Sequence, residues 1–303
     1  RSTPLYSSAA SDVYKRQPSY TAFQGSSFGF VSGGNAPPLV NVIEKYSFTS
    51  DGNSTDVADA LNASTNSAGQ SSSTHGYRAG GYTTGNINVI EKFSLTTAEN
   101  GSDVGDLTTS RAEVEGQSSE THGYASGGAS NVIDKHPFSA NANATDVGDL
   151  TTTRSSAGAQ SSSSNGYTSG GSPLSDVIDK FPFSSDANAT DVGDLTQARY
   201  GNAGQNSDTH GYTSGGRTPS GRVNTVDKFS FSADGNATDV GNLTVSRGDN
   251  PSGNSSTASG YTAGGFSPPS RNTIDKFPFS SDGNATDVGD LTQAKRGAAP
   301  HQV

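Results

Sequence analysis

One short pattern occurs six times along this chain, and it constrains the fold more than any other feature of the sequence. Each copy has an aromatic residue, two further residues and a pair of glycines, as in residues 167–171. The glycine pairs are Gly33-Gly34, Gly80-Gly81, Gly127-Gly128, Gly170-Gly171, Gly215-Gly216 and Gly264-Gly265. Consecutive pairs lie 47, 47, 43, 45 and 49 residues apart. This spacing is typical of a repeated unit of four short β-strands, and the units lack the apolar period of 3.6 residues that would favour helices.

Each unit contains four candidate strands. A polar run such as residues 69–73 comes first, and a turn containing Gly or Asn leads into the second strand, for example residues 167–171. The third strand is the most apolar one, as in residues 177–183, and the fourth carries Val192 and Leu195. In the first unit, Val57 and Leu61 are the expected equivalents, and Phe30 takes the position of the tyrosine.

The low hydrophobic content is consistent with such repeats. Only 29% of the residues are hydrophobic, which by itself would indicate disorder. A repeat architecture overcomes this shortage because neighbouring units share one core. The predicted fold class is therefore all-β, a six-bladed β-propeller with four-stranded blades.

The repeats also define the expected boundaries. The propeller is expected to span residues 18–295, with blades at about 18–61, 66–107, 113–150, 156–195, 201–243 and 248–291. Residues 1–17 do not match the repeat, and residues 12–17 resemble a translated sequencing adapter, so a disordered, non-native leader is predicted there. Residues 296–303 are expected to be a tail, the truncated start of a seventh unit, so that six blades close without strand exchange. The alternative is that the six units belong to a longer ring.

The units resemble the kelch repeat of β-propellers. In that family the second strand ends in an aromatic residue and a Gly-Gly pair, the third carries an aromatic residue, and the fourth has Trp and Leu before a link containing Pro or Arg. The residues that fit these places are Tyr167, Gly170, Gly171, Phe181, Leu195 and Arg199. Valines such as Val192 replace the tryptophan, so the units are kelch-like. The chain is also similar to repeat proteins of marine bacteriophage, which implies a virion or tail component.

Two sets of residues are expected to hold the blades together. The paired glycines permit close backbone approach, and a structural role is predicted for Gly80, Gly81, Gly127, Gly128, Gly170, Gly171, Gly215 and Gly216, together with the packing residue Tyr167. The second set consists of a third-strand acid, such as Asp179, and a basic residue four positions after the fourth-strand leucine, such as Arg199. We expect these to pair, partly buried, across a blade boundary. The alternative is that all are solvated surface charges. The first unit has Thr65 at the basic position.

The histidines do not indicate a metal site. Three of them share one turn position, but Asn165 and Ser259 occupy it in other units, so a turn role explains them; they are His75, His122 and His210. His136 replaces a third-strand aromatic residue and is expected to pack, and His301 lies in the predicted tail.

Other cofactor chemistry is similarly unsupported. Cysteine is absent, which excludes disulfides, thiolate metal sites and a cysteine nucleophile. Acidic turns such as residues 186–191 alternate oxygen ligands, but they lack the glycine and terminal Glu of an EF-hand. Ordinary Asx turns are the favoured interpretation, and calcium binding is the alternative. The sequence predicts no metal and no cofactor.

Charge and loop variation narrow the function. The net charge of −10 disfavours a nucleic-acid partner, and no apolar run is long enough for membrane insertion. The loops after the glycine pairs differ most between units, and specificity often resides in loops on a rigid scaffold. The predicted binding residues in these loops are Tyr82, Arg217, Arg222, Phe266 and Arg271. We expect a non-enzymatic scaffold that binds a protein or carbohydrate, in a virion or outside the cell. The alternatives are a purely structural assembly protein and a propeller-fold lyase or hydrolase.

Overall fold

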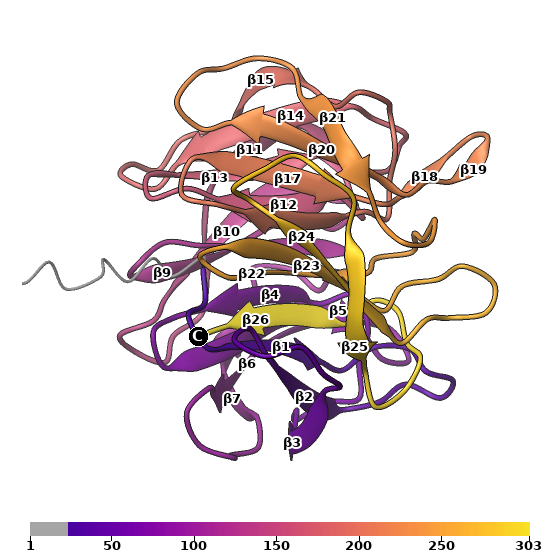
Figure 1. Cartoon of the computed structure of the whole chain (residues 1–303). Helices are drawn as coiled ribbons and strands as arrows, with labels where there is room; N and C mark the ends of the chain where they lie inside the picture. Colours follow the sequence, from indigo (N-terminus) through magenta and orange to yellow (C-terminus); the bar gives the residue numbers. More distant parts are fainter. Residues whose placement is uncertain (1–23) are drawn as a thin grey trace, which may run out of the picture.

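The computed structural model describes residues 24–303, and in this part of the chain the secondary structure is entirely β (Figure 1). Six antiparallel four-stranded sheets are arranged around a central axis, and a two-stranded hairpin projects from one of them. The predicted six-bladed β-propeller is confirmed. The predicted leader, residues 1–17, lies outside the described residues.

The blades are named here in chain order, and each is given from its innermost to its outermost strand. Blade one contains β26 (Ala299–Gln302), β1 (Phe28–Ser32), β2 (Val42–Ser47) and β3 (Thr55–Asp59). Blade two contains β4 (Ala68–Ser71), β5 (His75–Tyr82), β6 (Asn86–Ser94) and β7 (Ser102–Asp106), and blade three contains β8 (Val114–Ser118), β9 (His122–Gly127), β10 (Ser130–Pro137) and β11 (Thr145–Arg154). Blade four contains β12 (Gly158–Ser161), β13 (Asn165–Ser169), β14 (Val177–Pro182) and β15 (Thr190–Asp194). Blade five contains β16 (Ala203–Asn206), β17 (His210–Ser214), β20 (Thr225–Ser230) and β21 (Thr238–Asn242), with the hairpin β18 (Arg217–Thr218) and β19 (Gly221–Arg222). Blade six contains β22 (Ser252–Ser255), β23 (Ser259–Ala263), β24 (Thr273–Pro278) and β25 (Thr286–Asp290).

Blade one is built from both ends of the repeat array, which corrects the prediction that residues 296–303 form a tail and that the ring closes without strand exchange. β26 pairs antiparallel with β1, with Phe30 opposite His301. The first unit contributes only three strands to its blade, and β26 supplies the inner strand that every other unit carries ahead of its own glycine pair. Pairing β26 with β1 satisfies backbone groups that would otherwise form an open edge.

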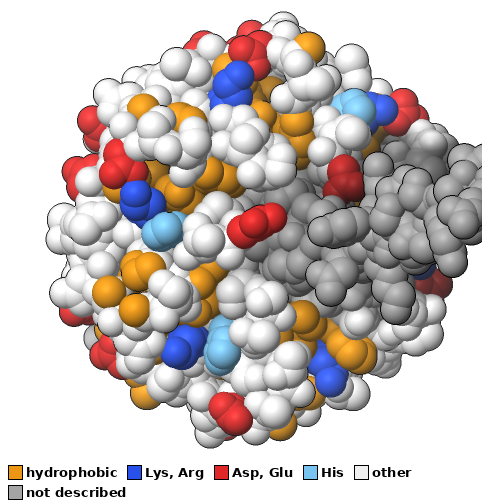
Figure 2. Space-filling model, turned by 90° about the vertical axis from the view of Figure 1, so that its left-hand side faces the viewer, with side chains coloured by type: hydrophobic (Ala, Val, Ile, Leu, Met, Phe, Trp, Pro, Cys, Tyr) orange, Lys and Arg blue, Asp and Glu red, His pale blue; other side chains and the backbone are white. Residues whose placement is uncertain are grey.

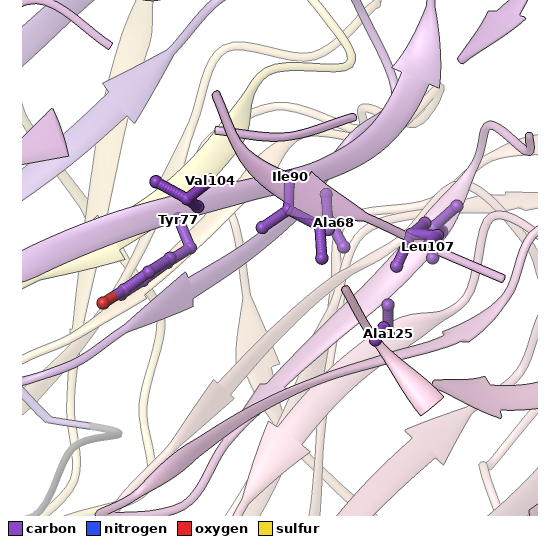
Figure 3. Close-up of a cluster of buried hydrophobic side chains, with 9 residues drawn as sticks. Ala68, Tyr77, Ile90, Val104, Leu107 and Ala125 are labelled. Carbon is purple, nitrogen blue, oxygen red and sulfur yellow. The ribbon is translucent and has the colours of Figure 1, made fainter. Parts of the chain in front are cut away.

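Aromatic rings pack between neighbouring blades. Tyr167 of blade four stacks on Phe231 of blade five with ring centroids 4.8 Å apart, and the same arrangement occurs at four other boundaries. Figure 3 shows one of the resulting core clusters, to which the six strands β4 to β9 of blades two and three contribute. The predicted packing role of Tyr167 is confirmed.

Glycine is required where backbone and rings come close. Both members of all six glycine pairs have positive φ, for example +71° at Gly170 and +119° at Gly171, which L-residues with side chains rarely adopt. Gly166 lies over the ring of Phe181, where a Cβ atom would stand 2.3 Å from the ring carbon Cζ. The spacing between the aromatic residue and the glycine pair, which is the same in all six units, therefore reflects backbone geometry and ring packing.

A buried ion pair lies at every blade boundary. At five of the six boundaries it joins the basic residue after one blade to the third-strand acid of the next, as the sequence predicted for the positions of Asp179 and Arg199. Arg154 donates to Asp179 at 2.8 Å, and Arg199 lies 3.0 Å from Asp227. The pairs are Arg78–Glu91, Arg111–Asp134, Arg154–Asp179, Arg199–Asp227, Arg247–Asp275 and Lys295–Glu44. Their side chains are at most 3% exposed, so they are fully buried, and the alternative of solvated surface charges is wrong. Burial lowers the pKa of Arg199, and the charge of Asp227 acts in the opposite direction.

The boundary between blades one and two uses a different arginine. Leu61 is 49% exposed and Ala60 is buried in its place, so the prediction that Leu61 is the core equivalent of Leu195 is wrong by one residue. Ser64, not Thr65, consequently occupies the basic position. Arg78 from β5 fills this space, with its Nη2 atom 2.5 Å from Ser64 Oγ and its Nη1 atom 3.1 Å from Glu91.

Candidate functional site

The six innermost strands surround a narrow polar channel. The inner strands of neighbouring blades are so close together that only small residues fit between them. A Cβ atom on Gly116 of β8, for example, would stand 2.2 Å from the carbonyl oxygen of Gly69 on β4. The cavity between the strands is about 100 Å³. A closed ring of hydrogen bonds runs around it, each from a backbone N–H to a side-chain oxygen of the next blade: Ser71 to Ser118, Ser118 to Ser161, Ser161 to Asn206, Asn206 to Ser255, Ser255 to Gln302 and Gln302 to Ser71.

A second closed ring lies at the end of the channel nearest the variable loops. It consists of six residues with φ between +54° and +64°, and each N–H donates to the carbonyl oxygen of the preceding member, with Asn66 donating to Gly297 to close the ring. The members are Asn66, Glu113, Ser156, Gly201, Asn250 and Gly297. The side-chain amide of Asn250 donates to Asn66 Oδ1 at 3.1 Å and to Ser156 Oγ at 3.3 Å, and so crosses the axis.

Outside this ring is a cavity of about 250 Å³, which we call the vestibule. Its lining is dominated by amides, hydroxyls and charged groups. The lining residues outside the ring of positive-φ residues are Asn35, Thr65, Tyr200, Asp249 and Arg296. Such groups can hydrogen-bond a polar ligand from several directions.

The first residue after a glycine pair lies next to a linker residue, and for Asn35, Tyr82 and Arg217 that linker residue lines the vestibule. Arg217 pairs with Tyr200 through a β-bridge, Phe266 with Gly248, and Tyr82 with Thr65. The residues at this position are Asn35, Tyr82, Ala129, Ser172, Arg217 and Phe266, and no two are alike. A uniform scaffold therefore presents six different side chains at corresponding places around one end of the channel.

A charged cluster of blades five, six and one borders the vestibule, which Asp249 and Arg296 line directly. Asp249 accepts hydrogen bonds from Arg222 at 3.1 Å and from Arg296 at 3.0 Å. The ring of Phe266 lies 4.5 Å from the guanidinium of Arg222 and 4.8 Å from that of Arg296. Both distances are within the range of cation–π attraction.

The structure brings together some, but not all, of the predicted binding residues. Arg222 and Phe266 are in contact, and Arg217 is the cross-strand partner of Arg222 in the β18–β19 hairpin, at the right of Figure 1. Arg271 follows the loop that begins with Phe266, whereas Tyr82 belongs to blade two, where its side chain is 44% exposed. Their role in binding stays a prediction.

Sequence reasoning missed Asp249 and Arg296. Asp249 lies in a linker one residue longer than its equivalents, since Gly248-Asp249-Asn250 corresponds to Tyr200-Gly201. Arg296 falls within the tail predicted for residues 296–303. The extra residue was a visible signal for Asp249, whereas Arg296 reaches the vestibule only because β26 closes the ring.

The opposite face carries the turn histidines, some of which are visible in Figure 2 beside blue basic side chains. In each case the histidine Nδ1 atom contacts the preceding threonine hydroxyl at 2.8–2.9 Å, at the turn between the first and second strands. The predicted turn role is confirmed. Partial burial lowers the pKa of His75, His122 and His210, and nearby lysines act in the same direction.

The acidic turns connect neighbouring blades. Asn188 Oδ1 accepts from Asp149 N–H at 3.0 Å, and Lys180 reaches Asp234 at 2.6 Å. Asp191 makes the predicted Asx-type contact, accepting from Gly193 N–H at 3.1 Å. Within residues 24–303, no group of three or more His, Cys, Asp or Glu side chains is placed to hold a metal ion.

Of the described residues, two histidines and one glutamate are buried outside the boundary pairs. Burial lowers the pKa of His136 to about 4, and this side chain packs against Tyr77 and Phe138 as predicted. Burial raises the pKa of Glu115 to about 8, although Ala157 N–H donates to its carboxylate at 2.7 Å. His301 in β26 accordingly does not lie in a tail: burial lowers its pKa to about 3, and its Nε2 atom lies 2.8 Å from Ser32 Oγ.

We expect His301→Gln to reduce the loss of stability in mild acid. A histidine with a pKa of about 3 when folded and 6.5 when unfolded binds a proton preferentially in the unfolded state, so stability falls as the pH drops below 6.5. Between pH 6.5 and 5 this amounts to about 2 kcal/mol. Glutamine occupies the equivalent position in blades two to five. Urea unfolding at pH 7.5 and pH 5 measures the loss of stability in each chain. His75→Asn, at a half-buried turn, is the control. If His301→Gln loses as much stability as the wild type between these pH values, the prediction is wrong.

The fold and the site define a class: the protein is a six-bladed β-propeller whose first blade combines strands from both ends of the repeat array. Neither a scan against protein-family models nor a search of curated proteins finds a match to the chain. Residues 24–303 include no helix of the length and apolar character needed to cross a membrane.

Proposed function

We propose that this propeller is a non-enzymatic binding scaffold, and that its ligand binds at the vestibule. The observation that carries the proposal is the contrast between the blade boundaries, which repeat the same contacts, and the six unlike residues that follow the glycine pairs. Binding residues are commonly found on loops held by a rigid framework.

The composition of the vestibule supports a carbohydrate ligand over a largely apolar one. Amides and hydroxyls dominate the lining, with Tyr200 as an aromatic group. The cavity of about 250 Å³ is smaller than the roughly 300–1,000 Å³ of typical small-molecule sites. The cavity is therefore of a size to hold one end of a longer saccharide.

The setting proposed for this activity is a virion, a phage tail or the extracellular space. The similarity to repeat proteins of marine bacteriophage supports this setting. A binding propeller exposed on a particle would meet surface glycans.

A glycan array tests the proposed function. We expect the wild-type chain to bind a defined subset of glycans, and Tyr82→Ser combined with Tyr200→Ser to lower the signal about tenfold, because both changes remove aromatic surface near the vestibule. Leu61→Ser is the matched control, since it removes a side chain of similar exposure outside these loops. An array without signal above background would contradict the proposal and favour a purely structural role.

A further inference from the structure

The arginines are unevenly distributed over the propeller. Residues 24–303 contain nine arginines, and five of them form the buried boundary pairs. The other four all belong to loops or linkers of blades five, six and one. This group, which we call the arginine sector, consists of Arg217, Arg222, Arg271 and Arg296. In a chain with a net charge of −10, such a concentration of positive charge requires a reason.

The arginine sector is incompletely neutralised. Arg217 and Arg222 are directly opposite each other in the β18–β19 hairpin, an arrangement that is unfavourable for like charges. Arg222 and Arg296 share the single carboxylate of Asp249. Burial lowers the pKa of Arg247, and the positive charge of the nearby Arg271 acts in the same direction. Glu113, the other acid of the vestibule, accepts a hydrogen bond from Ser155 in the linker to blade four.

Phe266 makes this arrangement rigid. Its ring contacts the guanidinium groups of both Arg222 and Arg296, and Asp249 fixes the same two groups from another side. Planar guanidinium groups held in this way are suited to bidentate recognition of a carboxylate or sulfate. An incoming anion would relieve the repulsion between Arg217 and Arg222 without requiring the arginines to reorganise.

We propose that the ligand is an acidic carbohydrate, whose carboxylate or sulfate group binds the arginine sector while its hydroxyl groups bind the amide and hydroxyl side chains of the vestibule. This inference rests on the proposed function and adds the charge of the ligand. The polar lining favours a saccharide over an acidic polypeptide, because no aliphatic side chain lines the vestibule among the described residues.

Calorimetric titration with a galacturonic acid trisaccharide tests the inference, with the neutral galactose trisaccharide of the same linkage and polyglutamate as comparison probes. We expect the uronate to bind and its affinity to fall as salt increases. Arg222→Gln combined with Arg296→Gln should weaken binding about tenfold or more. Lys45→Gln is the matched control, because Lys45 is also 4.5 Å from an aromatic ring, that of Phe28, and its loss changes the net charge by the same step as each arginine replacement.

The possible outcomes separate the two proposals. Equal binding of the neutral and acidic trisaccharides, unaffected by the arginine changes, would overturn the inference and leave the carbohydrate-binding function intact. Polyglutamate binding at or above the affinity of the uronate would overturn the choice of a carbohydrate. Absence of binding by both saccharides and by every glycan of the array would contradict the proposed function itself. Circular dichroism and thermal unfolding of the double variant confirm that a loss of binding is not a loss of fold.

Discussion

Replacing Arg78 by threonine will destabilise the propeller by about 3–5 kcal/mol, because Glu91 is left buried without its cationic partner. Adding Ser64→Arg to this variant will restore most of the loss. At four other boundaries an arginine projects from the position of Ser64, and blades four, five and six have threonine at the position of Arg78. The double variant thus gives the first boundary the linker arginine and the second-strand threonine that the chain already uses elsewhere, with Glu91 in the place of the aspartate.

A double-mutant cycle by urea unfolding measures this exchange. Ser64→Arg alone should be destabilising, since it places a second guanidinium beside Arg78 and Glu91. The coupling between the two changes should therefore be large and favourable. A double variant no more stable than Arg78→Thr would show that the two arginine positions are not interchangeable. Arg154→Ala, which leaves Asp179 unpaired, provides the comparison at an ordinary boundary.

Removing residues 299–303 will open the ring and lower the unfolding temperature by about 10 °C or more, on the scale of about 2 °C or more per kcal/mol for a domain of this size. β1 would lose its inner partner, and Asn254 would lose the carbonyl of His301, to which it donates at 2.6 Å. The ring of hydrogen bonds through Gln302 would also be interrupted. Differential scanning calorimetry of the shortened and complete chains measures the effect.

Moving the strand tests whether closure itself is responsible. When residues 298–303 are joined ahead of residue 24 through a flexible Gly-Ser linker, blade one acquires its inner strand from the same end of the chain, as the other blades do. We expect this rearranged chain to regain most of the lost thermal stability. If the shortened chain unfolds at the wild-type temperature, β26 does not contribute to the stability of the ring.

The repeated residues allowed the fold to be predicted in detail. Spacing, glycine pairs and aromatic positions indicated six four-stranded blades, and the recurring acid and arginine indicated buried pairs across the boundaries. These predictions succeeded because each contact occurs several times, so a single exception does not obscure it.

The exceptions were harder to predict because they depend on contacts between distant segments. The use of Arg78 in place of an arginine at position 64 is accompanied by a change in the acid of the ion pair. The acid is Glu in blades one and two, where its partner is Lys295 or Arg78. It is Asp at the four boundaries where the partner is a linker arginine. Recognising it required placing Lys295 beside Glu44, which means joining the two ends of the array. The vestibule cluster was missed in part for the same reason, because Arg296 approaches Asp249 only in a closed ring.

The composite first blade also sets the order of events during synthesis. β1 is made early, but its inner partner β26 is the last strand of the described chain to leave the ribosome. Blades two to six can each assemble soon after their own residues emerge, whereas blade one stays incomplete until translation has passed residue 302. The vestibule, which needs Arg296 beside Asp249, is consequently formed only after residue 302 has been made, so a nascent chain cannot engage a ligand at this site before the ring has closed.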